Sequence, residues 1–153
     1  MIDKSPEQNP NFQDCIKFAS EHPDVYFATD DNGQPRVRGM MLWFADETGF
    51  YFQTQSVKSF CKQLRKNNRV EVCFNNSSSS KPSKVMRVTG LVKFIEDIKL
   101  KKKVLADRPF LKTMGLNDPE NPVLVVFKIY TGEAFFWTLK DSMHEAEIER
   151  IRF

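Results

Sequence analysis

Residues 26–74 read YFATDDNGQPRVRGMMLWFADETGFYFQTQSVKSFCKQLRKNNRVEVCF and alternate between strand-like and turn-like segments. Asp31-Asn32-Gly33 is a hairpin turn signal, and a second polar turn follows at residues 46–49. Since only short turns join the segments between them, the strands are expected to run antiparallel. The predicted strands are residues 25–29, 37–45 and 50–54.

A helix follows the third strand directly. Apolar side chains recur there with helical spacing, at Val57, Phe60, Cys61 and Leu64. This stripe predicts an amphipathic helix over residues 57–67, with Cys61 in the core. Residues 70–74 then alternate as a further strand.

The flanking segments complete the expected fold, which is α+β and mainly β: an antiparallel, barrel-like sheet of six or seven strands with flanking helices. Helices are expected from the Asn9 cap to His22, over residues 97–106 with solvated lysines at 99–103, and as a turn at 109–116. Strands are expected at 85–95, with a bulge or bend at Gly90, and in a last hairpin of residues 123–130 and 133–139 that turns at Thr131-Gly132. Residues 75–83 have the composition of a polar loop. In residues 142–153 a few apolar side chains at roughly helical spacing weakly indicate a helix.

The composition fits one domain over residues 1–153, with a core at about 9–140 and a tail at 141–153. With 41% hydrophobic and 28% charged residues the chain can bury a core, and 14 Phe make that core rich in aromatic rings. A net charge of +3 does not by itself indicate a nucleic-acid partner. The N-terminal residues lack the apolar region of a secretory signal, so none is expected. No apolar run is long enough for a membrane span, and the three cysteines form no C-x-x-C pair. We therefore expect a cytoplasmic protein with no membrane span, disulfide framework or metal site.

The junction between the third strand and its helix predicts an anion site. The first N–H groups of a helix lack internal partners and carry the positive end of its dipole. Thr54 and Ser56 add hydroxyl groups there, and Lys58 and Lys62 add charge on successive turns. From Lys58 to Arg69 the chain has five cations and no acid.

The second strand carries a matching set of residues. Arg36 and Arg38 are two positions apart and share one face of the strand, which Met40 and Leu42 extend as an apolar wall. Gly39 allows a flat ligand to approach the backbone. Cations, an apolar wall and free backbone groups suit a phosphate-bearing aromatic cofactor. The alternative interpretation is that these charges are ordinary solvated surface residues.

Taken in order, these segments resemble the pyridoxamine 5′-phosphate oxidase-like family, the FMN-binding split barrels. The segments MRVTGLVKF (86–94), RPFLKTMG (108–115) and GEAFFWTL (132–139) are similar to later parts of the family, so the resemblance covers about residues 12–140. The earlier elements that carry it are Ala28-Thr29, the Gly33-Gln34-Pro35 turn, Arg36-Val37-Arg38, Tyr51 to Thr54, Lys58, Lys62-Gln63-Leu64 and Asn67.

The resemblance implies a homodimer that holds FMN at its subunit interface and acts as an oxidoreductase on a small molecule. It implies that Arg38 and Lys58 hold the phosphate with help from Ser56 or Thr54. It further implies that the backbone groups of residues 38–42, Gln53 and Thr54 line the isoalloxazine ring, with Trp137 as a contact from the partner subunit. No catalytic side chain is identified. With the two cationic patterns included, the expected cofactor-binding residues are Arg36, Arg38, Gly39, Met40, Met41, Leu42, Gln53, Thr54, Ser56, Lys58, Lys62 and Trp137.

The chain also departs from the pyridoxamine 5′-phosphate oxidases proper. Its loop before the helix is a residue shorter, with SVK at residues 56–58, and Val85 stands near the position of a family Gln. These departures favour the oxidase-related branch, which includes general stress and flavin-reductase-like proteins, and they leave the substrate open. Two alternatives remain: the same fold with deazaflavin or haem, for which only His22 and His144 exist as histidine ligands, and a non-catalytic barrel that binds single-stranded nucleic acid on its aromatic rings.

Overall fold

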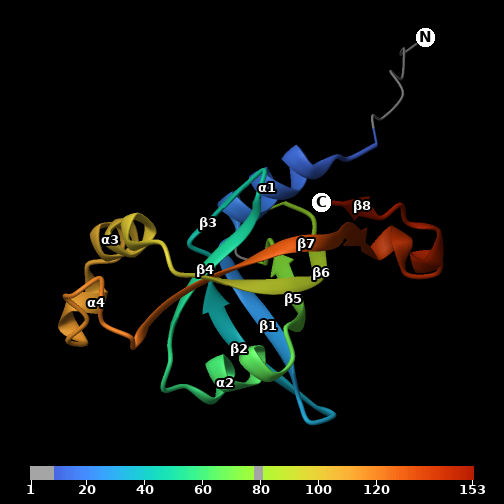
Figure 1. The fold of residues 1–153 in the computed structure, drawn as a ribbon. Coiled ribbons are helices and arrows are strands. Elements are labelled where there is room, and N and C mark those ends of the chain that lie inside the picture. Colours follow the sequence, from blue (N-terminus) through green and yellow to red (C-terminus); the bar gives the residue numbers. More distant parts are fainter. Residues whose placement is uncertain (1–8, 78–80) are drawn as a thin grey trace.

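The computed structural model describes residues 9–77 and 81–153 (Figure 1). The described strands form an antiparallel sheet in the order β2-β1-β5-β6-β7-β4-β3, and β8 pairs with β7 beside that path. This confirms the predicted mainly-β α+β class. The strands are β1 (Asp24–Asp31), β2 (Gln34–Met41), β3 (Phe44–Asp46), β4 (Gly49–Gln55), β5 (Arg69–Asn75), β6 (Lys84–Ile95), β7 (Leu124–Thr138) and β8 (Ile151–Arg152).

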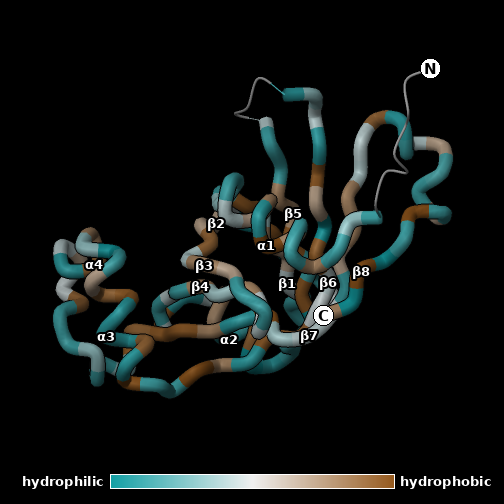
Figure 2. Tube along the Cα trace, turned by 90° about the horizontal axis from the view of Figure 1, so that it is seen from above, coloured by the Kyte–Doolittle hydropathy of each residue, from teal (hydrophilic) through white to brown (hydrophobic). Residues whose placement is uncertain are grey.

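The helices flank this sheet at its ends. Figure 1 shows α2 next to the β1–β2 hairpin, and Figures 1 and 2 show α3 and α4 together at one end of the long β6–β7 ribbon. The first helix is capped by Asn11 and not by Asn9, because Asn11 accepts from the N–H of Asp14 while the Asp14 carboxylate accepts from the Asn11 N–H. The bounds are α1 (Phe12–Glu21), α2 (Ser59–Lys66), α3 (Ile98–Asp107) and α4 (Phe110–Thr113).

Phenylalanine rings fill the inside of the barrel. Phe27 of β1 packs edge to face against Phe52 and Phe60, with ring centroids 5.2 and 5.1 Å apart. Phe60 reaches this core from the predicted apolar stripe of α2, on which Cys61 is also buried. The core therefore holds α2 against β1, which fixes the junction where the anion site is expected.

The predicted hairpin at Thr131-Gly132 is wrong, because residues 124–138 form one continuous strand, β7. Gly132 makes no turn and lies opposite Gly90 of β6. A Cβ on Gly132 would overlap Thr89 O and lie 2.7 Å from the Gly90 Cα. The glycine therefore serves the close approach of two strands and not a reversal of the chain.

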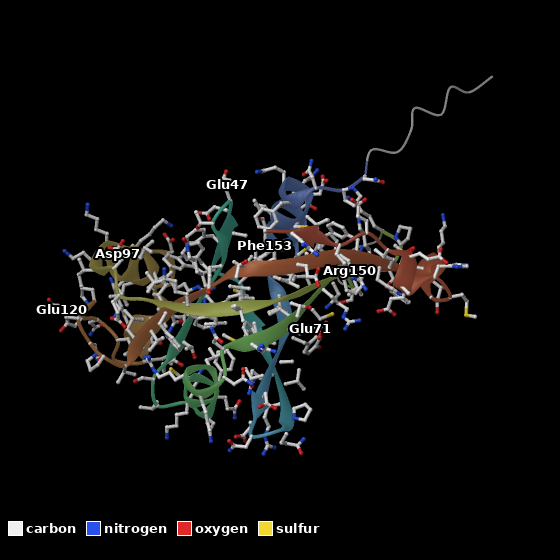
Figure 3. The ribbon with its side chains drawn as sticks, turned by 45° about the vertical axis from the view of Figure 1, so that its right-hand side comes forward. Glu47, Glu71, Asp97, Glu120, Arg150 and Phe153 are labelled. Atoms are coloured by element: carbon white, nitrogen blue, oxygen red, sulfur yellow. The ribbon has the colours of Figure 1, made fainter. Side chains whose placement is uncertain are left out.

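The tail is not a helix. It forms two short 3₁₀ turns, Leu139–Asp141 and Glu145–Glu147, followed by β8. The backbone N–H and C=O of Phe153 bond to Gly132 at 3.1 and 3.2 Å, and Figure 3 shows Phe153 beside the β7 ribbon. Ile151 and Phe153 both pack on the core. Their spacing of two residues suits a strand and overrides the weak helical pattern.

Several boundaries differ from the expected ones. The second strand begins earlier, at Gln34, and ends at Met41, where two residues separate it from β3. The register of β6 against β7 shifts between Leu91 and Val92, next to the bend predicted at Gly90. The predicted loop at 75–83 starts inside β5, and its residues 78–80 lie outside the described part of the chain.

The lysine-rich helix is only partly the solvated surface that its composition predicts. Lys101 is buried and donates to Glu96 at 3.0 Å, and Lys103 pairs with Asp107. Within residues 9–77 and 81–153, no helix combines the length and the hydropathy needed to cross a bilayer.

Candidate functional site

A cavity of about 760 Å³ lies between the β1–β2 hairpin and α2. Its volume is within the range of ligand pockets. Three of the predicted cations, Arg36, Arg38 and Lys62, line it together. We call it the cationic cavity; its remaining lining residues are Asp30, Asp31, Asn32, Val37, Ser59, Gln63, Lys66 and Asn67.

Arg38 is held in the wall of this cavity by neutral oxygen atoms. Its Nη1 donates to Thr29 Oγ1 at 2.8 Å and to Phe27 O at 3.1 Å, and its Nη2 donates to Gln63 Oε1 at 2.8 Å. The guanidinium carbon lies 4.6 Å from the centre of the Phe60 ring. These contacts fix the guanidinium between β2 and α2, whereas the sequence indicates an anion site at the junction of β4 and α2.

The charge of Arg38 is not balanced within the described residues. Arg36 is paired with Asp31 at 3.2 Å, whereas no carboxylate lies within ion-pair distance of Arg38. Burial lowers the pKa of Arg38, and the charge of Arg36 lowers it further. Both effects oppose the positive charge, and an anion in the cavity would relieve them.

Ser56 and Lys58 precede α2 but do not line the cationic cavity. Lys58 is the N-cap residue of α2, and no side chain of the described residues caps that end of the helix. Ser56 donates its N–H to Val123 O. Ser59, the next hydroxyl along the chain, lines the cavity instead. The helix end therefore keeps free N–H groups with no acid in its first turn.

Gln53 and Thr54 lie on β4, which is buried along its whole length. Thr54 Oγ1 is buried and has no hydrogen-bond partner among the described residues, and the same holds for Gln55 Oε1. β3 covers only residues 49–51 of the outer edge of β4, so the edge beyond Tyr51 has no neighbouring strand in the described structure. Buried polar atoms without partners are rare, and they often mark a bound group.

The second half of β2 lines a different cavity of about 510 Å³, which we call the β2 cavity. Gly39, Met40 and Met41 line it, with Tyr26 and His22 opposite. β2 is an edge strand that pairs only with β1, so its outer backbone groups are open to a ligand. The β2 edge thus borders both cavities in succession.

The backbone groups and side chain of Leu42 are used within the fold. Its N–H donates to Pro23 O at 2.8 Å, and its C=O accepts from Arg108 Nη2 at 2.9 Å. Its side chain is buried in the core. Leu42 therefore has no free backbone group for the ring.

Sequence reasoning missed Arg108, although it begins the RPFLKTMG segment. Arg108 also donates to Met41 O at 3.1 Å, so it ties the end of α3 to the break after β2. Beside it, Asp107 accepts from Trp43 Nε1 at 2.9 Å and from Lys103, and these two hydrogen bonds lower the pKa of Asp107. These contacts border a third cavity, of about 440 Å³.

Trp137 lies away from all of these cavities. The register places it opposite Val85, on the outward face of the sheet. We call this surface the outer face. By the pairing of successive strands its members are Asp24, Tyr26, Ala28, Val37, Gly39, Met41, Glu71, Cys73, Asn75, Val85, Arg87, Thr89, Glu133, Phe135 and Trp137.

In the described part of the chain, no three His, Cys, Asp or Glu side chains lie close enough together to hold a metal ion. Of the two histidines, His22 borders the β2 cavity and His144 lies exposed in the tail, 3.6 Å from Glu147.

Comparisons with solved structures find proteins of the same fold. Among solved structures, the chain is similar to a NimC/NimA family protein from Clostridium acetobutylicum (25% identity, 92% of each chain covered, TM-score 0.74). It is also similar to General Stress Protein 26 from Bacillus anthracis (22% identity, 93% of this chain and 98% of that one, TM-score 0.70). A third relative is an FAD-binding protein from Mesorhizobium loti (18% identity, 84% and 95% covered, TM-score 0.65).

These likenesses confirm the split-barrel fold. A comparison with curated proteins found no match. The family model described as pyridoxamine 5′-phosphate oxidase matches residues 12–138. The chain therefore belongs to the pyridoxamine 5′-phosphate oxidase family.

Proposed function

We propose that this protein binds FMN, as a homodimer, and works as a flavin-dependent oxidoreductase. The observation that carries the proposal is the guanidinium of Arg38, a partly buried cation whose hydrogen-bond partners among the described residues are all neutral, in the wall of the cationic cavity. A phosphate monoester carries close to two negative charges at neutral pH and would balance this charge. Membership of a family that typically binds flavin supports the same ligand.

The residues present fit such a cofactor. Arg38, Arg36 and Lys62 would hold its phosphate, and the free N–H groups at the start of α2 would add to them. The open edges of β2 and β4 would offer backbone donors and acceptors to the polar rim of the ring, and Thr54 Oγ1 is a buried group that still lacks a partner. The bound flavin would supply hydride and electron transfer, while the chain supplies position and shielding from water.

The nucleic-acid alternative loses its main support. Stacking on bases requires exposed rings, but most Phe side chains on the strands are buried in the barrel. Haem requires an axial ligand, and neither histidine lines the cationic cavity.

We expect the purified protein to be yellow and to release FMN when it is denatured. The released chromophore, identified by chromatography against FMN, FAD and deazaflavin standards, tests the cofactor directly. Protein that purifies without chromophore should take up added FMN and quench its fluorescence. A haem spectrum, or a failure to bind any added flavin, would contradict the proposal.

The outer face supports the dimer. Tyr26, Val37 and Met41 are 60%, 69% and 51% exposed on neighbouring strands, which is unusual for large apolar side chains on a sheet. Exposed apolar side chains that gather on one part of a face, here on β1 and β2, are typical of a protein interface. The same face borders the β2 cavity through Tyr26 and Met41, so a second copy seated on it would close that cavity.

Val37→Asp is expected to weaken the dimer by about tenfold or more, because it buries a charge in an apolar contact. Sedimentation equilibrium would show a shift from twice the 17.8 kDa chain mass toward the monomer. Met114→Asp is the control, since Met114 is also an exposed apolar side chain but lies just after α4, off the outer face. Equal effects of the two substitutions would argue against this interface.

A further inference from the structure

Three side chains form a closed hydrogen-bonded ring at the cationic cavity. Arg38 Nη1 donates to Thr29 Oγ1 at 2.8 Å, Thr29 Oγ1 donates to Gln63 Oε1 at 2.7 Å, and Arg38 Nη2 donates to the same Oε1 at 2.8 Å. Thr29 is buried, and the three residues come from β1, β2 and α2. The ring therefore joins the three elements that surround the cavity.

The chemistry of the ring fixes the orientation of the Gln63 amide. A guanidinium only donates, and the single hydroxyl hydrogen of Thr29 is used toward Gln63. The atom of Gln63 that faces both must therefore be its oxygen. Its Nε2, with two N–H donors, has no acceptor among the described residues, and neither has Arg38 Nε.

Gln63 lines the cationic cavity together with Lys62 and Lys66. Because its oxygen is used in the wall, the amide nitrogen is the part of this side chain left for a ligand. This nitrogen is not among the buried polar atoms of the described residues that lack a partner, so it is open to a ligand, and a phosphate oxygen is a strong acceptor.

We propose that Gln63 is a positioning residue that holds Arg38 through Oε1 and donates through Nε2 to the same phosphate. This inference rests on the proposed binding of FMN. It makes the site selective for the phosphorylated flavin over riboflavin, because Gln63 and Arg38 act on the phosphate and not on the ring.

The test is the ratio of FMN to riboflavin affinity in Gln63→Glu, measured by fluorescence titration. Glutamate keeps the acceptor toward Thr29 and Arg38 but replaces the N–H donor by an anionic oxygen. We expect FMN affinity to fall about 20-fold, as for the loss of one charged hydrogen bond, with riboflavin affinity within about twofold. Gln13→Glu, the same change at an exposed site on α1, should leave both affinities unchanged.

Gln63→Leu removes both roles and should weaken FMN binding at least as much. It keeps the test decisive if the glutamate variant does not fold. Unchanged FMN affinity in the folded variants, or an equal loss for FMN and riboflavin, would overturn the inference while wild-type binding still upheld the proposed function. Wild-type protein that binds neither flavin would overturn both.

Discussion

Arg38→Ala should weaken FMN binding by about 100-fold, or about 2.7 kcal/mol, the largest effect that we expect from any single cation. The substitution removes a cavity cation that neutral oxygens hold in the wall and that has no acid partner among the described residues, whereas Arg36 is already neutralised by Asp31. Riboflavin lacks the phosphate, so its affinity should change by only about twofold. Fluorescence titration with both flavins measures the difference.

The control for this loss needs a lysine or arginine whose removal disturbs no contact. Lys101 is unsuitable because it is buried and bonded to Glu96. Lys102→Ala, at an exposed position of the same helix, removes a charge without that complication and should bind FMN as the wild type does. Arg38→Lys keeps the charge but not the forked geometry, so its affinity should lie between the two. Equal FMN affinities in Arg38→Ala and Lys102→Ala would remove Arg38 from the phosphate site.

Local signals in the sequence were sufficient for much of this fold. The Asp31-Asn32-Gly33 turn has positive φ at Asn32 and Gly33, as its residue types predict. Phe60, Cys61 and Leu64 are buried along α2, as their spacing predicts, but Val57, the first member of the predicted stripe, is exposed and precedes the helix, which begins at Ser59. Signals of this kind depend on neighbours within a few residues, so a single sequence displays them.

The cavity wall depends on partners that are far apart in the chain. Thr29 and Gln63 are separated by 34 residues, and Arg108 contacts a carbonyl 66 residues away. No local pattern indicates these pairs. The sequence therefore predicted the cations Arg36, Arg38 and Lys62 but not the neutral Gln63, which orients Arg38. It also predicted Lys58 as a phosphate ligand, but Lys58 does not line the cationic cavity.

Glycine was ambiguous for a different reason. A glycine after threonine is typical of a tight turn, but it also permits close contact between strands, and the sequence alone does not separate these uses. Gly132 serves the second purpose, since its φ is not positive, unlike that of Gly33, Gly49 and Gly115. The distinction can be tested through stability.

Gly132→Ala should destabilise the protein by about 3 kcal/mol, near the upper end for overpacking, because the new Cβ meets backbone atoms of β6 that cannot rotate away. The strand would have to separate from Thr89 and Gly90 and would strain the hydrogen bonds from Gly132 to Phe153. For a chain of this length we expect the thermal midpoint to fall by about 6–12 °C. Gly39→Ala is the control, since a Cβ there meets no atom within 4 Å and its φ is not positive. Calorimetry of the flavin-free proteins should therefore show a midpoint close to wild type for Gly39→Ala, and similar losses in both variants would refute the idea that Gly132 is required for close packing of β6 on β7.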